Sequence, residues 1–261
     1  MNEGDGMKYL LACQTDVGSV KQTNQDSLLI KRAICNEEQL VLAVVCDGMG
    51  GLQKGEVASA SLVREFSRWF EEELPEILKQ ADVETGILLS WDSLLKEMNE
   101  RISAYGKQHE IQLGTTVTAI IFVNNEYFVA HVGDSRAYEL GEQMFQITRD
   151  QTLVAREVEQ GLLTEEEAEQ DSRRSVLLQC IGASEQIVPA YIKGNVHKDA
   201  VYLLCCDGFR HVISSQEIYE HFRPEEMVDE DILEERCREL IRLNMERGEQ
   251  DNISVIAIRT W

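Results

Sequence analysis

Two stretches of the sequence share one design: Leu40-Val-Leu-Ala-Val-Val-Cys-Asp47-Gly48 and Ala200-Val-Tyr-Leu-Leu-Cys-Cys-Asp207-Gly208. In each stretch, an unbroken apolar run of strand length ends at Asp-Gly. Such a run is typical of a strand that is buried on both faces. The Asp then stands where the chain leaves the core, and the Gly lets a metal ion or ligand approach the backbone closely. The sequence therefore predicts two core strands that each end in a carboxylate.

Two further carboxylates stand at the ends of apolar runs. Asp134 follows the run 127–132, and Asp251 precedes the run 252–258. An Asp beside a Gly after a strand is more often a turn signal than a metal ligand. Four such carboxylates together, however, suggest one acidic site that binds hard cations, because these prefer oxygen ligands.

Length and composition predict one globular domain over residues 1–261. The apolar fraction of 43% is enough for a sizeable core, and none of the three prolines marks a linker. Residues 1–7 are expected to be a disordered start. The sequence leaves open whether the chain begins at Met1 or at Met7.

Charge and cysteine usage exclude several classes of partner. The net charge of −22 repels nucleic-acid backbones and anionic lipid, because these carry the same sign. No apolar run reaches the roughly 18 residues needed to span a membrane. The seven cysteines include no C-x-x-C pair, and Cys13, Cys46, Cys205 and Cys206 are expected to be buried, reduced thiols. We therefore expect a cytoplasmic protein that binds neither nucleic acid nor membrane.

The order of the predicted elements favours an α+β fold. Strands are predicted at 9–15, 27–33, 40–46, 115–123, 127–132, 137–140, 144–147, 187–193, 201–206 and 253–259. Helices are predicted at 56–79, 85–108, 152–169, 175–180, 215–222 and 230–246. Strands in hairpin-like runs, with helices in adjacent pairs, indicate antiparallel sheets that pack together and are covered by helices.

The acidic segment within 150–175 has two interpretations. It begins a short helix with a capping box, Thr164-Glu-Glu-Glu167. The segment could be a mobile flap over the site, or it could be a solvated surface helix. The sequence favours neither.

Carboxylates at strand ends suit a two-metal hydrolase. Two Mg²⁺ or Mn²⁺ ions about 4 Å apart can hold a water and lower its pKa, which suits the hydrolysis of phosphate esters. Asp47 could bridge the two ions, with the backbone carbonyl of Gly48 as an additional ligand. Asp207 and Asp251 would complete the coordination of one ion.

The chain resembles the metal-dependent PPM family of protein Ser/Thr phosphatases, which is PP2C-like, and its bacterial branch in particular. The resemblance runs from Tyr9 to Arg259 and rests on an ordered set of motifs. They are Asp16-Val-Gly-Ser-Val-Lys-Gln-Thr-Asn24-Gln25-Asp26, Val45-Cys-Asp47-Gly-Met-Gly-Gly51, Leu113-Gly114-Thr115-Thr116, Val132-Gly-Asp134-Ser-Arg136, Ile147-Thr-Arg-Asp150, Cys205-Cys-Asp207-Gly208 and Gln250-Asp251-Asn252. It implies a four-layer α-β-β-α sandwich, in which two antiparallel sheets are flanked by helices.

The resemblance also implies roles for individual residues. Asp47 would bridge the two core metals, with Gly48 offering its carbonyl, and Asp207 and Asp251 would be the other direct ligands of the first metal. Asp47, Asp207 and Asp251 are therefore the expected catalytic carboxylates. Asp134, together with Asp207, would hold a third and weaker metal.

Supporting residues follow from the same resemblance, together with three departures from the family pattern. Asp26 would support the metals, and Asn252 would orient the neighbouring Asp. Gln25 stands where the family often has Glu. Lys21 replaces the usual phosphate-binding Arg and keeps the charge, but it lacks the bidentate fork. Met49 stands where eukaryotic members often place a His, so it cannot act as a general acid.

The resemblance implies Mg²⁺/Mn²⁺-dependent hydrolysis of phosphoserine and phosphothreonine in proteins by a water that bridges the metals. The expected partners are substrates of a cytoplasmic Ser/Thr kinase, and the chain is expected to be a monomer. One alternative is a non-enzymatic module that senses or sequesters a phosphoprotein. Another is a regulatory phosphatase dedicated to one anti-sigma-like partner. The five histidines form no metal-ligand spacing, and His131, within a predicted core strand, is expected to be structural.

Overall fold

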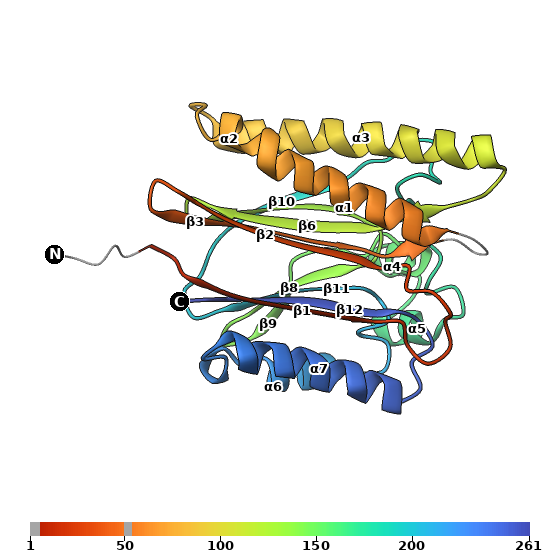
Figure 1. Ribbon diagram of the computed structural model, residues 1–261. Helices are drawn as coiled ribbons and strands as arrows, with labels where there is room; N and C mark the ends of the chain where they lie inside the picture. Colours follow the sequence, from red (N-terminus) through yellow and green to blue (C-terminus); the bar gives the residue numbers. More distant parts are fainter. Residues whose placement is uncertain (1–5, 50–53) are drawn as a thin grey trace.

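The computed structural model describes residues 6–49 and 54–261 of the chain. Two β-sheets face each other, and helices cover the outer side of each sheet (Figure 1). This arrangement confirms the predicted α-β-β-α sandwich. Residues 1–5 of the expected disordered start, and Gly50 and Gly51 of the second motif, lie outside the described residues. Met7 packs against the core.

Both large sheets are antiparallel throughout. The first sheet has the order β1 (Tyr9–Asp16), β12 (Ile253–Thr260), β11 (Val201–Cys205), β8 (Arg136–Leu140) and β9 (Met144–Gln146). The second has the order β10 (Ala190–Asn195), β7 (Glu126–Val132), β6 (Val117–Val123), β3 (Glu38–Cys46) and β2 (Ser27–Cys35). The short strands β4 (Gly48–Met49) and β5 (Gly114–Thr115) form a separate pair.

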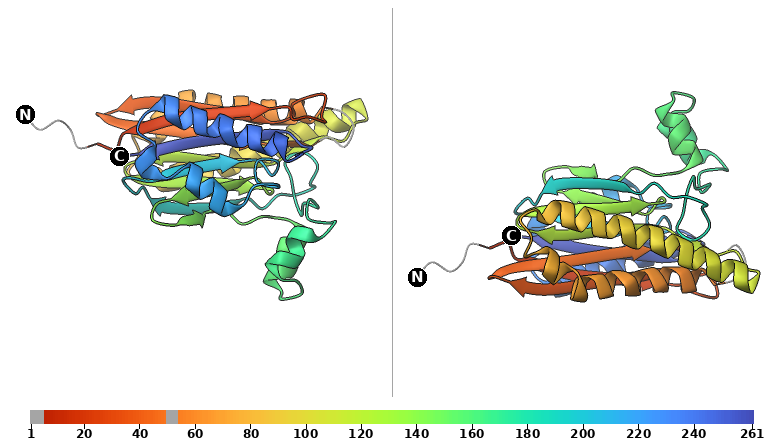
Figure 2. Two further views of the ribbon diagram at one scale, coloured as in Figure 1. Left: turned by 90° about the horizontal axis from the view of Figure 1, so that it is seen from below. Right: turned by 90° about the horizontal axis from the view of Figure 1, so that it is seen from above.

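The helices fall into three groups. Over the second sheet lie α1 (Gly55–Glu72), α2 (Leu74–Ile77) and α3 (Val83–His109); over the first lie α6 (Ser215–His221) and α7 (Glu230–Glu246), with the 3₁₀-helix η1 (Pro224–Glu226) between them. The third group, α4 (Leu153–Glu159) and α5 (Glu165–Gln170), stands apart from the layers beside one edge of the sheets (Figure 2). Side chains at the N-caps of α3, α6 and α7 accept hydrogen bonds from the first turn, which fixes where each helix begins.

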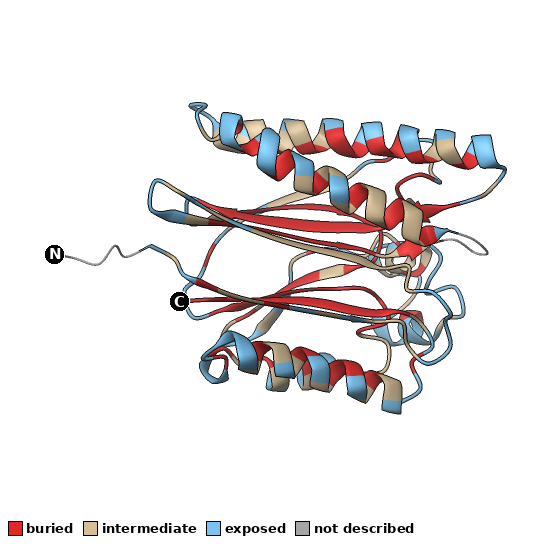
Figure 3. Cartoon of the chain, in the orientation of Figure 1, coloured by how far each residue is buried: buried red, intermediate tan, exposed pale blue. Residues whose placement is uncertain are grey.

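Alternate residues of β3 face two different hydrophobic cores. Val41, Ala43 and Val45 pack between the sheets, while Leu42 and Val44 pack under α1 and α3. The unbroken apolar run of this strand is therefore explained by burial on both faces (Figure 3).

Aromatic rings join the two sheets at the end that holds the chain termini. Tyr9 and Tyr202 come from the first sheet, and Phe122 and Tyr127 come from the second. The ring centroids of Phe122 and Tyr202 are 5.0 Å apart, and those of Tyr9 and Phe122 are 5.4 Å apart. These four residues, the aromatic cluster, close that end of the sandwich by packing.

Three local expectations are wrong. The helix predicted over 56–79 is interrupted at Glu73, because Pro75 lacks the backbone N–H that an uninterrupted helix needs. No helix forms at 175–180; there the backbone N–H of Leu178 donates to the carbonyl of Gln151 at 2.8 Å, and Thr152 pairs with Leu177 in a β-bridge.

Cys13 is the third, because it is exposed rather than buried. Its neighbour Ala12 faces the core, and successive residues of a strand face opposite sides. The other three cysteines expected to be buried, Cys46, Cys205 and Cys206, are buried free thiols as predicted.

Candidate metal centre and active site

The acidic residues meet at the end of the sandwich opposite the aromatic cluster. Asp47 directly follows β3 of the second sheet, whereas Asp207 follows β11 and Asp251 precedes β12 of the first sheet. Because β11 and β12 are antiparallel neighbours, the end of one and the start of the other lie at the same edge. The predicted ligands therefore come from both sheets.

Two threonines fix the backbone of Asp47. Its N–H donates to the hydroxyl of Thr116 at 3.0 Å, and its carbonyl accepts from the N–H of Thr116 at 2.8 Å. The hydroxyl of Thr115 donates to the same carbonyl at 2.9 Å. The motif at Gly114 to Thr116 therefore has a structural role, because it holds the backbone of Asp47. A Cβ atom on Gly48 would lie 2.3 Å from the carbonyl oxygen of Gln25, so no side chain fits beside Asp47.

Asp47 and Asp207 are coupled carboxyl groups. Burial raises the pKa of Asp47 well above its usual value, and the negative charges of Asp26 and Asp207 raise it further. Burial alone would also raise the pKa of Asp207, but the hydrogen bond and charge of His211 outweigh it and lower that pKa to about 2. The two carboxyl groups therefore differ in how readily each gives up its proton, Asp207 more readily than Asp47.

Asp134 and Asp26 lie at the margins of this pair. Burial raises the pKa of Asp134 to about 7, and the charge of Asp207 adds to the effect. Burial also raises the pKa of Asp26 to about 7, although the hydroxyl of Ser254 donates to its Oδ2 at 2.6 Å and opposes the shift. That hydrogen bond joins the loop before β2 of the second sheet to β12 of the first.

Two buried oxygen atoms at the site have no hydrogen-bond partner among residues 6–49 and 54–261: Oδ1 of Asp26 and Oδ1 of Asp207. A buried carboxylate oxygen without a partner is costly, and a hard cation is the group that would satisfy it. Carboxylate oxygens are the donors that Mg²⁺ and Mn²⁺ prefer. The residues present therefore fit such an ion.

No group of three or more His, Cys, Asp or Glu side chains within residues 6–49 and 54–261 is already arranged as a metal site. Asp251 is instead paired with a cation of the protein itself, because Lys21 Nζ lies 3.0 Å from its Oδ1. Burial alone would lower the pKa of Lys21, but the hydrogen bond and charge of Asp251 raise it, so the ammonium stays charged. The predicted phosphate-binding lysine thus lies among the acids, paired with one of them.

Asn252 ties the predicted ligand loop to the segment that carries Lys21 and Gln25. Its side-chain oxygen accepts from the N–H of Gln25 at 2.9 Å, and its amide donates to the carbonyl of Val17 at 3.0 Å. Its backbone N–H donates to Asp251 Oδ1 at 2.8 Å. The side chain of Gln25 reaches Glu56 only at 3.4 Å.

Two residues of the site were missed by the sequence analysis, His211 and Glu249. Nε2 of His211 lies 3.3 Å from Asp207 Oδ2, and its Nδ1 lies 3.4 Å from Glu249 Oε2. Burial alone would lower the pKa of His211, but its two acidic neighbours raise it to about 9. The available signal was weak: Glu249 stands two residues before Asp251, and His211 stands four residues after Asp207.

His131, in contrast, is structural as expected. It is fully buried in β7, and its Nδ1 lies 2.9 Å from the hydroxyl of Thr118. Its Nε2 lies 3.0 Å from the carbonyl of Arg149. Burial lowers the pKa of this ring to about 4.

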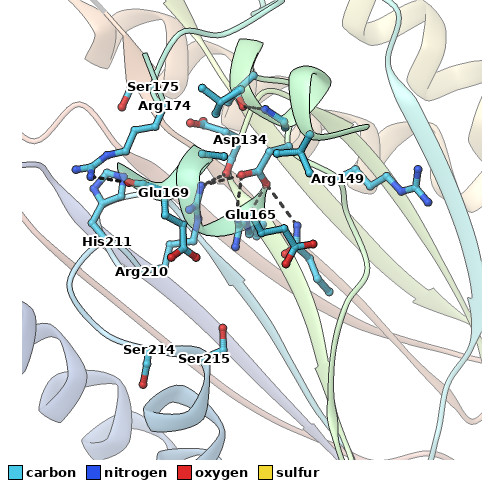
Figure 4. A pocket seen from close by; sticks show the side chains of 18 of the residues that line it. Asp134, Arg149, Glu165, Glu169, Arg174, Ser175, Arg210, His211, Ser214 and Ser215 are labelled. Atoms are coloured by element: carbon cyan, nitrogen blue, oxygen red, sulfur yellow. Dashed lines mark hydrogen bonds and ion pairs between the residues drawn. The ribbon is translucent and has the colours of Figure 1, made fainter. Parts of the chain in front are cut away.

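A cavity of about 870 Å³ is lined by Asp134 and by His211, which contacts Asp207, but not by Asp47, Asp207 or Asp251 themselves (Figure 4). Its lining comes from β8, from the α4–α5 segment and from the loop before α6, and it includes Asp134 and His211. Arg136 binds Asp150 in a bidentate ion pair with bonds of 2.7 and 2.8 Å, and Arg210 joins the same carboxylate at 3.2 Å. The helical segment predicted at 152–169 forms two helices, α4 and α5, and residues of both line this cavity.

Comparisons with known proteins agree with this architecture. The family model of protein phosphatase 2C matches residues 14–252. The serine/threonine protein phosphatase PstP of Mycobacterium tuberculosis is 30% identical over 251 residues, which cover 94% of this chain and 44% of PstP. Protein phosphatase PhpP of Streptococcus pneumoniae is 29% identical over 248 residues, which cover 94% of both proteins. The chain thus spans less than half of the mycobacterial relative but nearly all of the streptococcal one.

Solved structures show the same fold. The crystal structure of PstP has a TM-score of 0.79 at 28% identity and covers 97% of this chain and 98% of that one. The Staphylococcus aureus phosphatase Stp1 has a TM-score of 0.81 at 26% identity and covers 95% and 94%. The catalytic domain of PstP, solved in complex with two manganese ions, has a TM-score of 0.78 at 28% identity and covers 97% and 99%. Because the family model matches residues 14–252 of 261, the chain belongs to the protein phosphatase 2C family.

Proposed function

We propose that this chain hydrolyses phosphoserine and phosphothreonine in proteins and that it depends on Mg²⁺ or Mn²⁺. The observation that carries the proposal is the unpartnered, buried Oδ1 of Asp207, which lies beside Asp47 at the meeting point of the two sheets. A related catalytic domain has been solved with two manganese ions. When bound, the ions would neutralise phosphate charge and supply a bridging water of lowered pKa as the nucleophile.

The residues of the chain divide the remaining tasks. Asp47 and the carbonyl of Gly48 would hold both core ions, and Asp207 and Asp251 would complete the set of protein ligands. Asp134, together with Asp207, would hold a third and weaker ion. Because clustered carboxylates repel one another, a bound cation would lower the free energy of this arrangement.

Lys21 would bind the substrate phosphate as a point charge. Since its ammonium is paired with Asp251 at 3.0 Å, a cation at Asp251 would release it toward the phosphate. Met49, which follows Gly48, offers no proton, so the leaving oxygen would take its proton from water. Asp26 and Asn252 would hold the metal-binding residues in place through hydrogen bonds to neighbouring segments. Gln25 would take part through its backbone N–H, which donates to Asn252.

The substrates that we propose are targets of a cytoplasmic Ser/Thr kinase, and we propose that residues 1–261 act as one domain and as a monomer. Support for a reducing compartment comes from the seven cysteines, all of which are free. In addition, no helix of the described residues is both long and apolar enough to cross a membrane.

The test is hydrolysis of p-nitrophenyl phosphate and of a phosphothreonine peptide, with Mn²⁺ and with excess chelator. Turnover that depends on Mn²⁺, and that is lost in Asp47→Asn, supports the proposal. Binding of the phosphopeptide with no turnover in any metal would favour the alternative of a phosphoprotein-binding module.

A further inference from the structure

We propose that Glu249 and His211 form a positioning clamp that fixes Asp207 and the loop before Asp251 relative to each other, so that both can bind one cation. The inference rests on the proposed metal-dependent function. It concerns two residues that the family motifs in this sequence do not include.

The imidazole of His211 lies between two carboxylates. Its Nε2 is 3.3 Å from Asp207 Oδ2, and its Nδ1 is 3.4 Å from Glu249 Oε2. The side chains are 14% exposed for His211, 12% for Asp207 and 6% for Glu249. Both ring nitrogens therefore lie in ion-pair contact with a carboxylate, in a partly desolvated setting where water screens such contacts less than at the surface.

The second oxygen of Glu249 shapes the ligand loop. Its Oε1 accepts from the backbone N–H groups of Gln250 and Asp251, at 2.8 and 2.9 Å. The Glu249 carboxylate thus has two contacts. Its Oε1 holds the backbone that leads into Asp251, and its Oε2 contacts the imidazole of His211. A change at Glu249 acts on both ligand loops at once.

The two loops are also in direct backbone contact. A Cβ atom on Gly208 would lie 2.2 Å from the carbonyl oxygen of Asn252. The thiol of Cys206 donates to the same carbonyl at 3.4 Å. These contacts set the separation of the loops, but they leave the side chain of Asp207 free to rotate.

The clamp removes that freedom at Asp207. Because His211 engages Oδ2, the unpartnered atom is Oδ1, and this oxygen is buried. In metal sites, partners that hold one atom of a ligand orient the other toward the ion, and their loss typically lowers metal affinity about 10- to 100-fold. His211 would select the oxygen of Asp207 that faces the cation.

His211 also lines the large cavity, so contact with substrate is the competing role (Figure 4). With both nitrogens occupied by carboxylates, however, the ring has no donor left for a leaving group. The two roles differ in what they change: a positioning residue alters metal binding, whereas a catalytic acid alters kcat at saturating metal.

The experiment uses the variants Glu249→Ala, Glu249→Gln and His211→Ala, with His197→Ala as the matched control. His197 also pairs with a glutamate, Glu139, but it precedes β11 and lies at the opposite end of that strand from Asp207. Calorimetry with Mn²⁺ gives the metal affinity, thermal unfolding with chelator gives the stability of the metal-free protein, and p-nitrophenyl phosphate gives kcat.

We expect Glu249→Ala and His211→Ala each to weaken Mn²⁺ binding about tenfold or more, while kcat at saturating Mn²⁺ stays within about threefold of the unchanged protein. Glu249→Gln keeps an oxygen for the two backbone N–H groups and should recover part of the affinity. If the double variant weakens binding no more than either single variant, the two residues act as one unit.

Unchanged Mn²⁺ affinity in both alanine variants would overturn the clamp while leaving the proposed function intact. A fall in kcat at saturating Mn²⁺ with unchanged affinity would overturn it in favour of a catalytic histidine. If His211→Ala does not fold, Glu249→Gln still decides through its own affinity. Absence of Mn²⁺ binding in the unchanged protein would overturn both proposals.

Discussion

Lys21 and Asp251 form an ion pair of 3.0 Å, which joins the residue expected to bind phosphate to a residue expected to bind metal. Both side chains are about two-fifths exposed, at 42% and 39%. An ion pair of this exposure contributes only about 0–1 kcal/mol to stability, because water screens it. The pair is therefore easily exchanged for a cation on Asp251 and a phosphate on Lys21.

Replacing Lys21 separates these two roles. Lys21→Ala should raise KM for a phosphothreonine peptide several-fold, since the positive charge near the phosphate is lost. It should also tighten Mn²⁺ binding modestly, because the competing ammonium is gone. Lys21→Arg keeps the charge and should hold KM near its original value. Steady-state kinetics and calorimetry check both effects, and an Ala variant with unchanged KM would remove Lys21 from the site.

Asp47→Asn should abolish turnover and yet stabilise the metal-free protein. The folded pKa of Asp47 is raised well above its unfolded value, so above the unfolded pKa the folded state keeps a proton that the unfolded state has already released, and the folded state is destabilised. This cost is present at pH 7, disappears as the pH falls below the unfolded pKa of about 4, and is absent in the variant. Thermal unfolding with chelator should show a higher Tm at pH 7 and a smaller difference at pH 4. Near-normal activity of the variant at saturating Mn²⁺ would contradict the two-metal assignment.

Asp134→Asn should impair binding of the weaker third ion and leave the two core ions bound. Two ions should remain bound in calorimetry, while kcat falls sharply and KM changes little, because the affected ion acts on water rather than on substrate binding. Loss of all metal binding in this variant would show that Asp134 belongs to the core set instead.

His131 should make the stability of the protein depend on pH in the mildly acidic range. Its folded pKa is about 4, against about 6.5 for an unperturbed histidine. The unfolded state therefore binds a proton first, and stability contributed by the neutral ring is lost as the pH falls from about 6.5 to about 4. The slope in that window should reach about 1.4 kcal/mol per pH unit. His131→Asn should lower the Tm at pH 7, because Asn fills less of the buried space, and should flatten this part of the profile. An equally steep profile in the variant would assign the dependence to other groups.

The sequence was a good guide wherever a feature is local. The β3 run is apolar because both of its faces are buried, and Asp47 stands where that strand ends. Strand and carboxylate could therefore be located from the local order of residues alone. The partnership of His211 with Glu249 could not, because it joins loops that are far apart in the chain and depends on strand pairing. The bridge between Thr152 and Leu177 was missed for the same reason, since tertiary pairing overrode a helix-like local pattern.

The ion pair between Lys21 and Asp251 was also beyond local reasoning. Each residue was assigned separately, to phosphate and to metal, and the resemblance gave no reason to pair them. The side chain of Asn252 joins the loop 17–25 to the start of β12. This tertiary contact brings the ammonium of Lys21 to the carboxylate of Asp251.

The aromatic cluster and the acidic site lie at opposite ends of the same sandwich, and the side-chain interactions at the two ends have opposite sign. The rings of Tyr202 and Phe122 attract one another across the sheets, whereas Asp47 and Asp207 repel unless a proton or a cation lies between them. The contact between the sheets at the aromatic end is therefore independent of cations, whereas the contact at the acidic end depends on how the carboxylate charge is compensated. We therefore expect the stability of the acidic end, to which the proposed function assigns substrate binding, to rise with the concentration of metal ion.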